Sequence, residues 1–303
     1  MTNAFGPWTT STHTTLELGR SRANLMDPAK RRRPMWIPFG LACVIVAIAR
    51  ADVRADGLIY QLPADGAWVR YDVEMKSNVK ATGMEPMQIN GPGTLLLSSV
   101  GHKSVNGEPC RWIEFAFEMS PPGASKKFSR ILKVLIPESR LKRGMDPFAH
   151  VRDMYYSQGG LLPEIPVERV EQSEKIDGAD YSRQQYELDR LRSVFPRLLK
   201  DLNSERESVD TKLGKLDCEK LTGKDELSKS LLRGGGEWAW SGDFHCLLNE
   251  KVPFGVVRLR SQVKGFEKPK EVATQDALQV ETEMILTVVE VGQGATSRLS
   301  TGK

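Results

Sequence analysis

This sequence of 303 residues lacks the short motifs that mark common catalytic and cofactor sites. It contains no G-x-S-x-G, H-E-x-x-H, P-loop or G-x-G-x-x-G pattern, which removes the usual signatures of serine hydrolases, zinc peptidases and nucleotide-binding proteins. Cysteine and histidine are scarce, at four residues each, and no C-x-x-C pair occurs, so no metal site is expected. We expect no cofactor, and the sequence favours a protein that is not an enzyme.

The chain also lacks net charge once its first 51 residues are set aside. These 51 residues hold seven of the 43 basic residues and two of the 39 acidic ones. Residues 52–303 therefore carry 36 basic and 37 acidic side chains, a net charge of −1. Because a near-neutral domain has little electrostatic attraction for phosphate backbones, we expect no nucleic-acid partner.

The basic residues of the first part precede an apolar run. Four consecutive basic residues (30–33) are followed by an apolar stretch (35–49) and by small-residue cleavage sites, the last ending at Ala55. This order is typical of a secretory signal peptide, and about 15 apolar residues are fewer than the roughly 20 that a spanning helix needs. We predict a leader over residues 1–55, with Met26 as an alternative start, and export to the periplasm or the medium. A retained N-terminal anchor is the alternative.

Three cysteines follow the leader. Export would place Cys110, Cys218 and Cys246 in an oxidising compartment, where two of them can pair. Cys218 and Cys246 both fall in predicted strands or strand edges of the C-terminal half, which favours a disulfide between these two. Three buried free thiols are the alternative, since cysteine is among the most buried residue types.

Residues 56–303 show the two-residue alternation of half-buried strands. In residues 68–75, Val69, Tyr71, Val73 and Met75 share one face, and charged residues occupy the other. Similar patterns recur along the domain, separated by Gly, Pro and Asn turns. About eight strands are predicted, over residues 68–75, 94–100, 111–119, 128–136, 213–221, 237–241, 254–263 and 279–291.

The middle of the domain changes to helical signals. Asp146 followed by Pro147 fits the start of a short helix. Between residues 180 and 203, apolar residues recur at threes, fours and sevens, which predicts a helix that packs on the sheet. Asp225 is a candidate cap of another short helix, which would end at glycines 234–236.

These segments predict one α+β domain, because no composition break or long linker divides residues 56–303. We expect a curved antiparallel sheet of about eight strands, a half-barrel, with a helical insertion over about residues 147–205 packed on one face. As an alternative, the apolar stripe of that insertion would contact a partner protein.

One segment of the C-terminal half resembles a known family. Trp238-Ala239-Trp240-Ser241, followed by Lys251-Val252-Pro253-Phe254-Gly255-Val256-Val257-Arg258, is similar to an element of exported bacterial proteins of the LolA/LppX lipoprotein-carrier superfamily. The resemblance covers residues 214–264. It implies a curved antiparallel sheet around an apolar cavity covered by helices, with a lipid or a lipoprotein as partner. The charged insertion between residues 136 and 213 departs from the family pattern.

Aromatic residues of this segment are candidate ligand contacts. Trp238 and Trp240 lie two apart in a predicted strand and so share a sheet face. With Phe254, they would line the site of an apolar or lipid-like ligand. Ordinary core packing is the alternative, because tryptophan is highly buried on average.

A basic segment supplies candidate anion contacts. Lys126, Lys127, Arg130 and Lys133 lie in or just before a predicted strand. On a solvated face they would contact anionic lipid headgroups, in a peripheral contact with the envelope membrane. A plain soluble outer face of the sheet is the alternative.

The sequence thus favours an exported, non-enzymatic envelope protein that binds an apolar or lipid-like ligand on the concave face of its sheet. A periplasmic hydrolase that uses His102, His150 or His245 is one alternative, since the members of a Ser-His-Asp triad need not be close in sequence. A structural or interaction module of the envelope is the other.

Overall fold

The computed structural model describes most of the predicted exported domain. The described residues are 58–83, 85–120, 122–123, 126–143, 145–160, 165–169, 175–176, 179–182, 188, 200–231, 236–268, 273 and 276–299. Two compact units are distinguished along the chain, residues 1–48 and 49–303, and every described residue belongs to the second. The predicted leader and its alternative start at Met26 lie outside the described residues.

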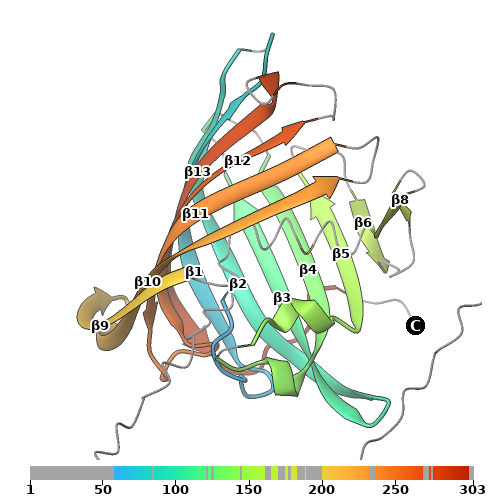
Figure 1. Cartoon of the computed structure of the whole chain (residues 1–303). Coiled ribbons are helices and arrows are strands. Elements are labelled where there is room, and N and C mark those ends of the chain that lie inside the picture. Colours follow the sequence, from blue (N-terminus) through green and yellow to red (C-terminus); the bar gives the residue numbers. More distant parts are fainter. Residues whose placement is uncertain are drawn as a thin grey trace, which may run out of the picture. The chain divides into compact units, whose positions relative to one another are not determined.

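One antiparallel sheet of 11 strands forms the core of the described structure (Figure 1). Its order is β6-β5-β4-β3-β2-β1-β13-β12-β11-β10-β9, so β1 and β13 are neighbours and the two halves of the chain extend from them in opposite directions. A separate pair is formed by β7 and β8. The strands are β1 (Trp68–Lys80), β2 (Met87–Val105), β3 (Glu108–Met119), β4 (Phe128–Pro137), β5 (Asp153–Gly159), β6 (Ile165–Arg169), β7 (Lys175–Ile176), β8 (Ala179–Ser182), β9 (Lys200–Thr211), β10 (Gly214–Leu231), β11 (Gly236–Leu248), β12 (Val256–Lys268) and β13 (Leu278–Gly292).

The alternation predicted for the first strand is confirmed. Val69, Tyr71 and Val73 of β1 are buried on the inner face, Met75 is half-buried there, and the charged residues between them are exposed. Cross-strand pairs continue this face, because directly opposite residues point to the same side of a sheet. Leu97 of β2, for example, pairs with Val69.

The sheet curls around its inner face. Arg143, in the loop after β4, forms an ion pair with Glu219 of β10 at 2.7 Å. The two strands are seven places apart in the sheet, which is about 34 Å in a flat sheet at ~4.8 Å per strand. Glycines favour tight curvature, and one lies on the inner face at Gly93, where a Cβ would stand 2.5 Å from the carbonyl oxygen of Glu118.

Three segments close one end of the curved sheet; we call this the closed end. Residues 58–61 meet the turn between β11 and β12, where Tyr60 N donates to Phe254 O at 2.8 Å and Gln61 Nε2 donates to Val252 O at 2.8 Å. The third segment connects β4 to β5 and carries the short 3₁₀ helices η1 (Glu138–Arg140) and η2 (Pro147–His150). Leu58, Ile59 and Phe148 are buried in the hydrophobic core.

The tip of the β9–β10 hairpin bends back onto the outer face of the sheet. Lys212 Nζ, in its turn, lies 2.9 Å from Oδ2 of Asp72, an exposed outer-face residue of β1. Val209 and Cys218 share the hairpin side that carries Leu216, and both are buried. The hairpin therefore buries its outer side at the tip and leaves its inner side free to line a cleft.

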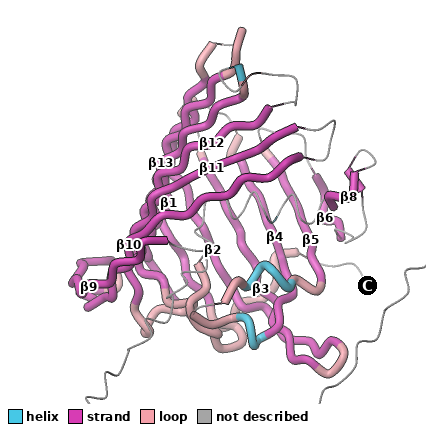
Figure 2. The backbone as a smooth tube through the Cα atoms, in the orientation of Figure 1, coloured by secondary structure: helices cyan, strands magenta, loops and turns pink. Residues whose placement is uncertain are grey.

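The predicted α+β class is wrong. Among the described residues, helix is limited to short pieces such as η1 and η2 (Figure 2), and the sheet has 11 strands rather than about eight. In the predicted insertion over residues 147–205, the described parts are mainly η2, β5 to β8 and the start of β9. Most of the helix predicted over residues 180–203 lies outside the described residues.

Two local helix signals had different outcomes. Asp146 caps η2 as predicted, because its Oδ1 accepts a hydrogen bond from Phe148 N at 2.9 Å, but the chain returns to strand at Asp153. Asp225 does not cap a helix, since it lies inside β10 opposite Gly242 of β11. Pairing with a strand distant in sequence overrides a local capping signal.

Candidate functional site

Near the closed end, the inner face is filled with buried side chains. Towards the opposite end of the strands, which we call the open end, its side chains become more exposed. One cross-strand row contains Val73, Leu286, Leu259, Cys246 and Leu221, all almost fully buried. This row is ordinary core. Ligand contacts on the inner face are therefore expected only closer to the open end.

The row nearest the open end is apolar and partly exposed. It runs through Met87, Val79, Val280, Gly265 and Trp240, which pair in succession across β2, β1, β13, β12 and β11. Met87 is 49% exposed. We call these five residues, together with Leu278, the apolar row.

Leu278 extends the apolar row along β13. It lies two positions before Val280 and so points to the same inner face, and it is 36% exposed. Among the described residues, three large apolar side chains are exposed, and two of them, Met87 and Leu278, belong to this row. An exposed apolar patch of this kind marks a binding surface more often than scattered single residues do.

Trp240 carries an unsatisfied polar group on this face. Trp240 is 4% exposed, and among the described residues its Nε1–H has no hydrogen-bond acceptor. The ring packs edge-on against Phe244, with centroids 6.5 Å apart. Gly242 makes room between them, because a Cβ there would stand 2.9 Å from the Phe244 ring.

The structure separates the aromatic ligand candidates. Trp240 lies on the inner face, whereas Phe254 is fully buried in the turn at the closed end, with a positive φ of 67°. Trp238 lies in β11, and its side chain is outside the described residues. Phe254 is therefore a core residue next to Gly255, whose φ of 90° turns the chain into β12.

The basic anion candidates do not form one surface. Lys126 and Lys127 are exposed before β4, and Arg130 lies over the ring of Tyr156 at 5.2 Å on the inner face. Lys133 is on the other face, 7% exposed, with its Nζ 5.0 Å from the ring centroid of Trp112. Their odd spacing in β4 places Arg130 and Lys133 on opposite faces.

Lys133 belongs to a buried cluster on the outer face. Burial lowers its pKa, while the nearby Glu114 opposes that shift. Glu114 is 1% exposed and accepts hydrogen bonds from Ser297 Oγ at 2.7 Å and Arg298 N at 3.0 Å. The C-terminal segment thus covers Glu114 rather than leaving this face open to an anionic ligand.

The structure does not bring Cys218 and Cys246 together. Cys246 pairs with Leu221, three residues from Cys218, so the two cysteines point to opposite faces about 10 Å apart along the strands. A disulfide requires Cα atoms within about 7 Å. Both residues and Cys110 are buried free thiols, and burial raises the pKa of Cys246 to about 12.

The three histidines of the domain are dispersed. His102 Nδ1 lies 3.4 Å from Asp65 Oδ2, and its side chain is 74% exposed. His150 and His245 are exposed. Within the described part of the chain, no group of three residues is arranged to hold a metal ion, and no helix is long and apolar enough to cross a membrane.

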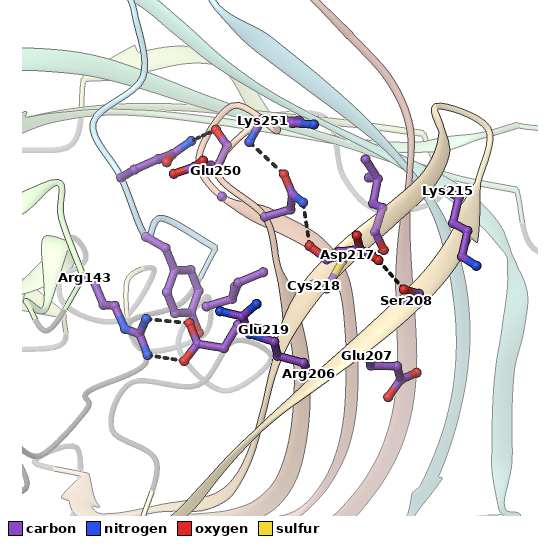
Figure 3. Close-up of a pocket in the computed structure, with 16 residues that line it drawn as sticks. Arg143, Arg206, Glu207, Ser208, Lys215, Asp217, Cys218, Glu219, Glu250 and Lys251 are labelled. Carbon is purple, nitrogen blue, oxygen red and sulfur yellow. Dashed lines mark hydrogen bonds and ion pairs between the residues drawn. The ribbon is translucent and has the colours of Figure 1, made fainter.

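A cleft of about 780 Å³ opens at the closed end, where four distant segments meet (Figure 3). Residues 60–61, Arg143, the β9–β10 hairpin and the turn at 248–255 line it. Arg143 holds Glu219 by two hydrogen bonds of 2.7 and 2.8 Å. Asn249 Nδ2 donates to Asp217 O at 2.8 Å and so ties the turn to the hairpin.

The charged lining of this cleft was not predicted from the sequence. Arg206, Lys215 and Glu219 share the inner side of the hairpin only because β9 and β10 pair in this register. The alternation of the hairpin strands could have indicated a shared side. No local sequence pattern could have placed Arg143 or Lys251 beside this side of the hairpin.

Comparisons with known proteins identify no family. No family model matches the sequence, and no curated protein matches it. Among solved structures, a chain described as a putative lipoprotein from Parabacteroides distasonis ATCC 8503 aligns with 9% identity and a TM-score of 0.28, over 78% of this chain and 100% of that one. A TM-score of this size does not establish a shared fold, so the LolA/LppX resemblance stays a prediction.

Proposed function

We propose that this chain is an exported protein of the bacterial cell envelope that binds an acyl lipid on the inner face of its sheet, at the open end. Export is supported by the order of basic, apolar and small residues within residues 1–55. Lipid binding is supported by the apolar row. The observation that carries the proposal is the buried indole N–H of Trp240, for which the described part of the chain provides no acceptor.

An acyl lipid matches both features of this surface. A buried donor without an acceptor costs about 1–3 kcal/mol, which a ligand oxygen beside Trp240 would recover. Met87, Val79 and Leu278 then offer partly exposed apolar surface to a hydrocarbon chain. A carboxylate or ester oxygen on an acyl chain combines the two groups in one molecule, whereas a pure hydrocarbon or a sugar supplies only one of them.

The proposal is tested by mass spectrometry and by titration with oleate. Native mass spectrometry of the protein purified from the envelope should show a bound lipid. Trp240→Phe removes the donor and Leu278→Gln makes the row polar, and each should weaken oleate binding about tenfold, since 1.4 kcal/mol corresponds to a factor of ten.

Leu62→Gln is the matched control for these variants. Leu62 is 42% exposed but lies in the segment before β1, away from the apolar row. The control should bind oleate as the unmodified protein does. Equal affinities for all four proteins, or no lipid and no oleate binding at all, would contradict the proposal.

A further inference from the structure

The acidic side chains of the cleft in Figure 3 are largely engaged within the protein. Glu219 is bound by Arg143 and also accepts a hydrogen bond from Ser204 Oγ at 2.9 Å. Asp217 accepts a hydrogen bond from Ser208, and Glu207 Oε2 lies 3.2 Å from Lys220 Nζ. Glu219 and Glu207 are thus balanced by basic side chains, whereas Asp217 keeps its negative charge, because the serine that binds it is neutral.

The basic side chains of the same cleft are less engaged. Arg206, Lys215 and Lys251 are exposed, and no ion pair within 4 Å is found for them among the described residues. Arg206 pairs in register with Glu219, four positions from Lys215, so the two cations are spread over about 13 Å of hairpin. Of the acids in the lining, Glu250 is exposed on the same turn as Lys251. Three cations of the lining are therefore left against two acids, Asp217 and Glu250, for which no ion pair is found among the described residues, so the remaining charge is positive by one.

A second cleft, of about 620 Å³, provides the contrast. It lies towards the open end of the strands and is lined by Lys76, Lys224 and Lys264 together with five acidic residues. Here Lys264 Nζ lies 2.9 Å from Glu281, and Lys224 Nζ lies 3.9 Å from Asp243. Two of the three lysines of the second cleft are thus paired with acids and five acids line it, whereas no ion pair is found for Arg206, Lys215 or Lys251 within the described part of the chain.

The first cleft is also close to the leader along the chain. Tyr60 and Gln61 line it, and Tyr60 lies eleven positions after the end of the apolar run at Ala49. Eleven residues span at most about 40 Å. During export, or with the leader retained as an anchor, the cleft therefore stays within reach of the membrane surface.

We propose that this cleft binds the phosphate groups of anionic phospholipid headgroups, through Arg206, Lys215 and Lys251. Arg206 and Lys215 are spread along the hairpin and Lys251 lies on the turn between β11 and β12, which suits several headgroups of a membrane surface better than one small anion. Each basic residue near an anionic membrane strengthens binding about fivefold, so the three together contribute about a hundredfold. This site is at the opposite end of the sheet from the apolar row.

Vesicle flotation tests the proposal with protein purified from the soluble envelope fraction. The protein should bind vesicles that contain phosphatidylglycerol more tightly than vesicles of phosphatidylcholine alone, and added salt should weaken this binding because exposed charges are screened. The triple variant Arg206→Gln, Lys215→Gln, Lys251→Gln should lose about a hundredfold in affinity. Near-ultraviolet circular dichroism checks that it is folded.

The control removes the same number of charges from the second cleft, as Lys76→Gln, Lys224→Gln, Lys264→Gln. The affinity of this control for phosphatidylglycerol vesicles should stay within about twofold of that of the unmodified protein, because neighbouring acids offset the lysines that it replaces. Equal losses in both triple variants would overturn the assignment to this cleft, as would no loss in the first. Full displacement by soluble glycerol phosphate would also overturn it, in favour of a site for a free phosphate ester.

Trp240→Phe should leave vesicle binding unchanged, which separates this proposal from the proposed lipid binding at the apolar row.

Discussion

Arg143 and Glu219 are joined by two hydrogen bonds, from Nη1 to Oε2 at 2.7 Å and from Nη2 to Oε1 at 2.8 Å. This bidentate pair connects the loop after β4 to β10, two parts of the sheet that meet only because it curls. The hydrogen bonds from Arg143 lower the pKa of Glu219, against the opposing effect of partial burial.

Glu219→Gln should therefore destabilise the protein in a pH-dependent way. A carboxyl group with a depressed pKa contributes stability above its unfolded pKa and loses it as the pH falls through the folded pKa. We expect a loss of about 1 kcal/mol at pH 7, because the pair is bidentate but partly exposed. Urea denaturation should show this difference at neutral pH and a smaller one in acid, as the pH falls through the lowered pKa of Glu219. Glu283→Gln, which breaks one exposed contact with Arg260, should cost less at pH 7. An equal loss at both pH values would contradict the prediction.

Tyr71→Phe should lower the free energy of unfolding by about 1–2 kcal/mol, because it removes a buried hydrogen bond. The Tyr71 hydroxyl is buried and donates to Val256 O at 3.0 Å, which ties β1 to the start of β12. Tyr155→Phe is the matched control, since Tyr155 is half-buried and packs its ring against Trp112. Equal stabilities for the two variants in urea denaturation would show that the Tyr71 hydrogen bond adds nothing.

Gly242→Ala should destabilise the protein by about 1–3 kcal/mol through overpacking. The added Cβ would stand 2.9 Å from the Phe244 ring and 3.0 Å from Val263 Cγ2. Gly159→Ala, whose Cβ would meet only Ser129 Oγ at 3.2 Å, should cost less. Thermal unfolding of both variants compares the two losses. If Gly242→Ala has the same Tm as the unmodified protein, the predicted overpacking is refuted.

The cysteines of the folded domain should react slowly with thiol reagents, because the thiolate is the reactive form and burial raises the pKa of all three. In a Cys43→Ser variant of the full chain, three thiols should titrate after unfolding without a reductant. A count of one would instead reveal a disulfide between two of these three cysteines.

Local alternation predicted eight strands that the structure contains but missed β5, β6 and β9 of the same sheet, and the rest depended on contacts distant in sequence. Val69, Tyr71 and Val73 reveal their strand because each occupies the same face of one segment. Asp225 shows the opposite case, since its capping signal is local but its place is set by pairing with β11. The cleft joins Tyr60, Arg143 and Lys251, and no periodicity could indicate that they meet. The unsatisfied Trp240 was a candidate from its spacing alone, but its missing acceptor is visible only in the structure.

Lipid binding at the apolar row is tested most directly by the indole N–H resonance of Trp240. In protein labelled with ¹⁵N-tryptophan, the signal is assigned by its loss in Trp240→Phe. Addition of oleate should move it downfield, because the buried N–H gains an oxygen acceptor, while the other indole signals shift less. An unchanged Trp240 signal in protein that has bound oleate would place the ligand elsewhere and contradict the account.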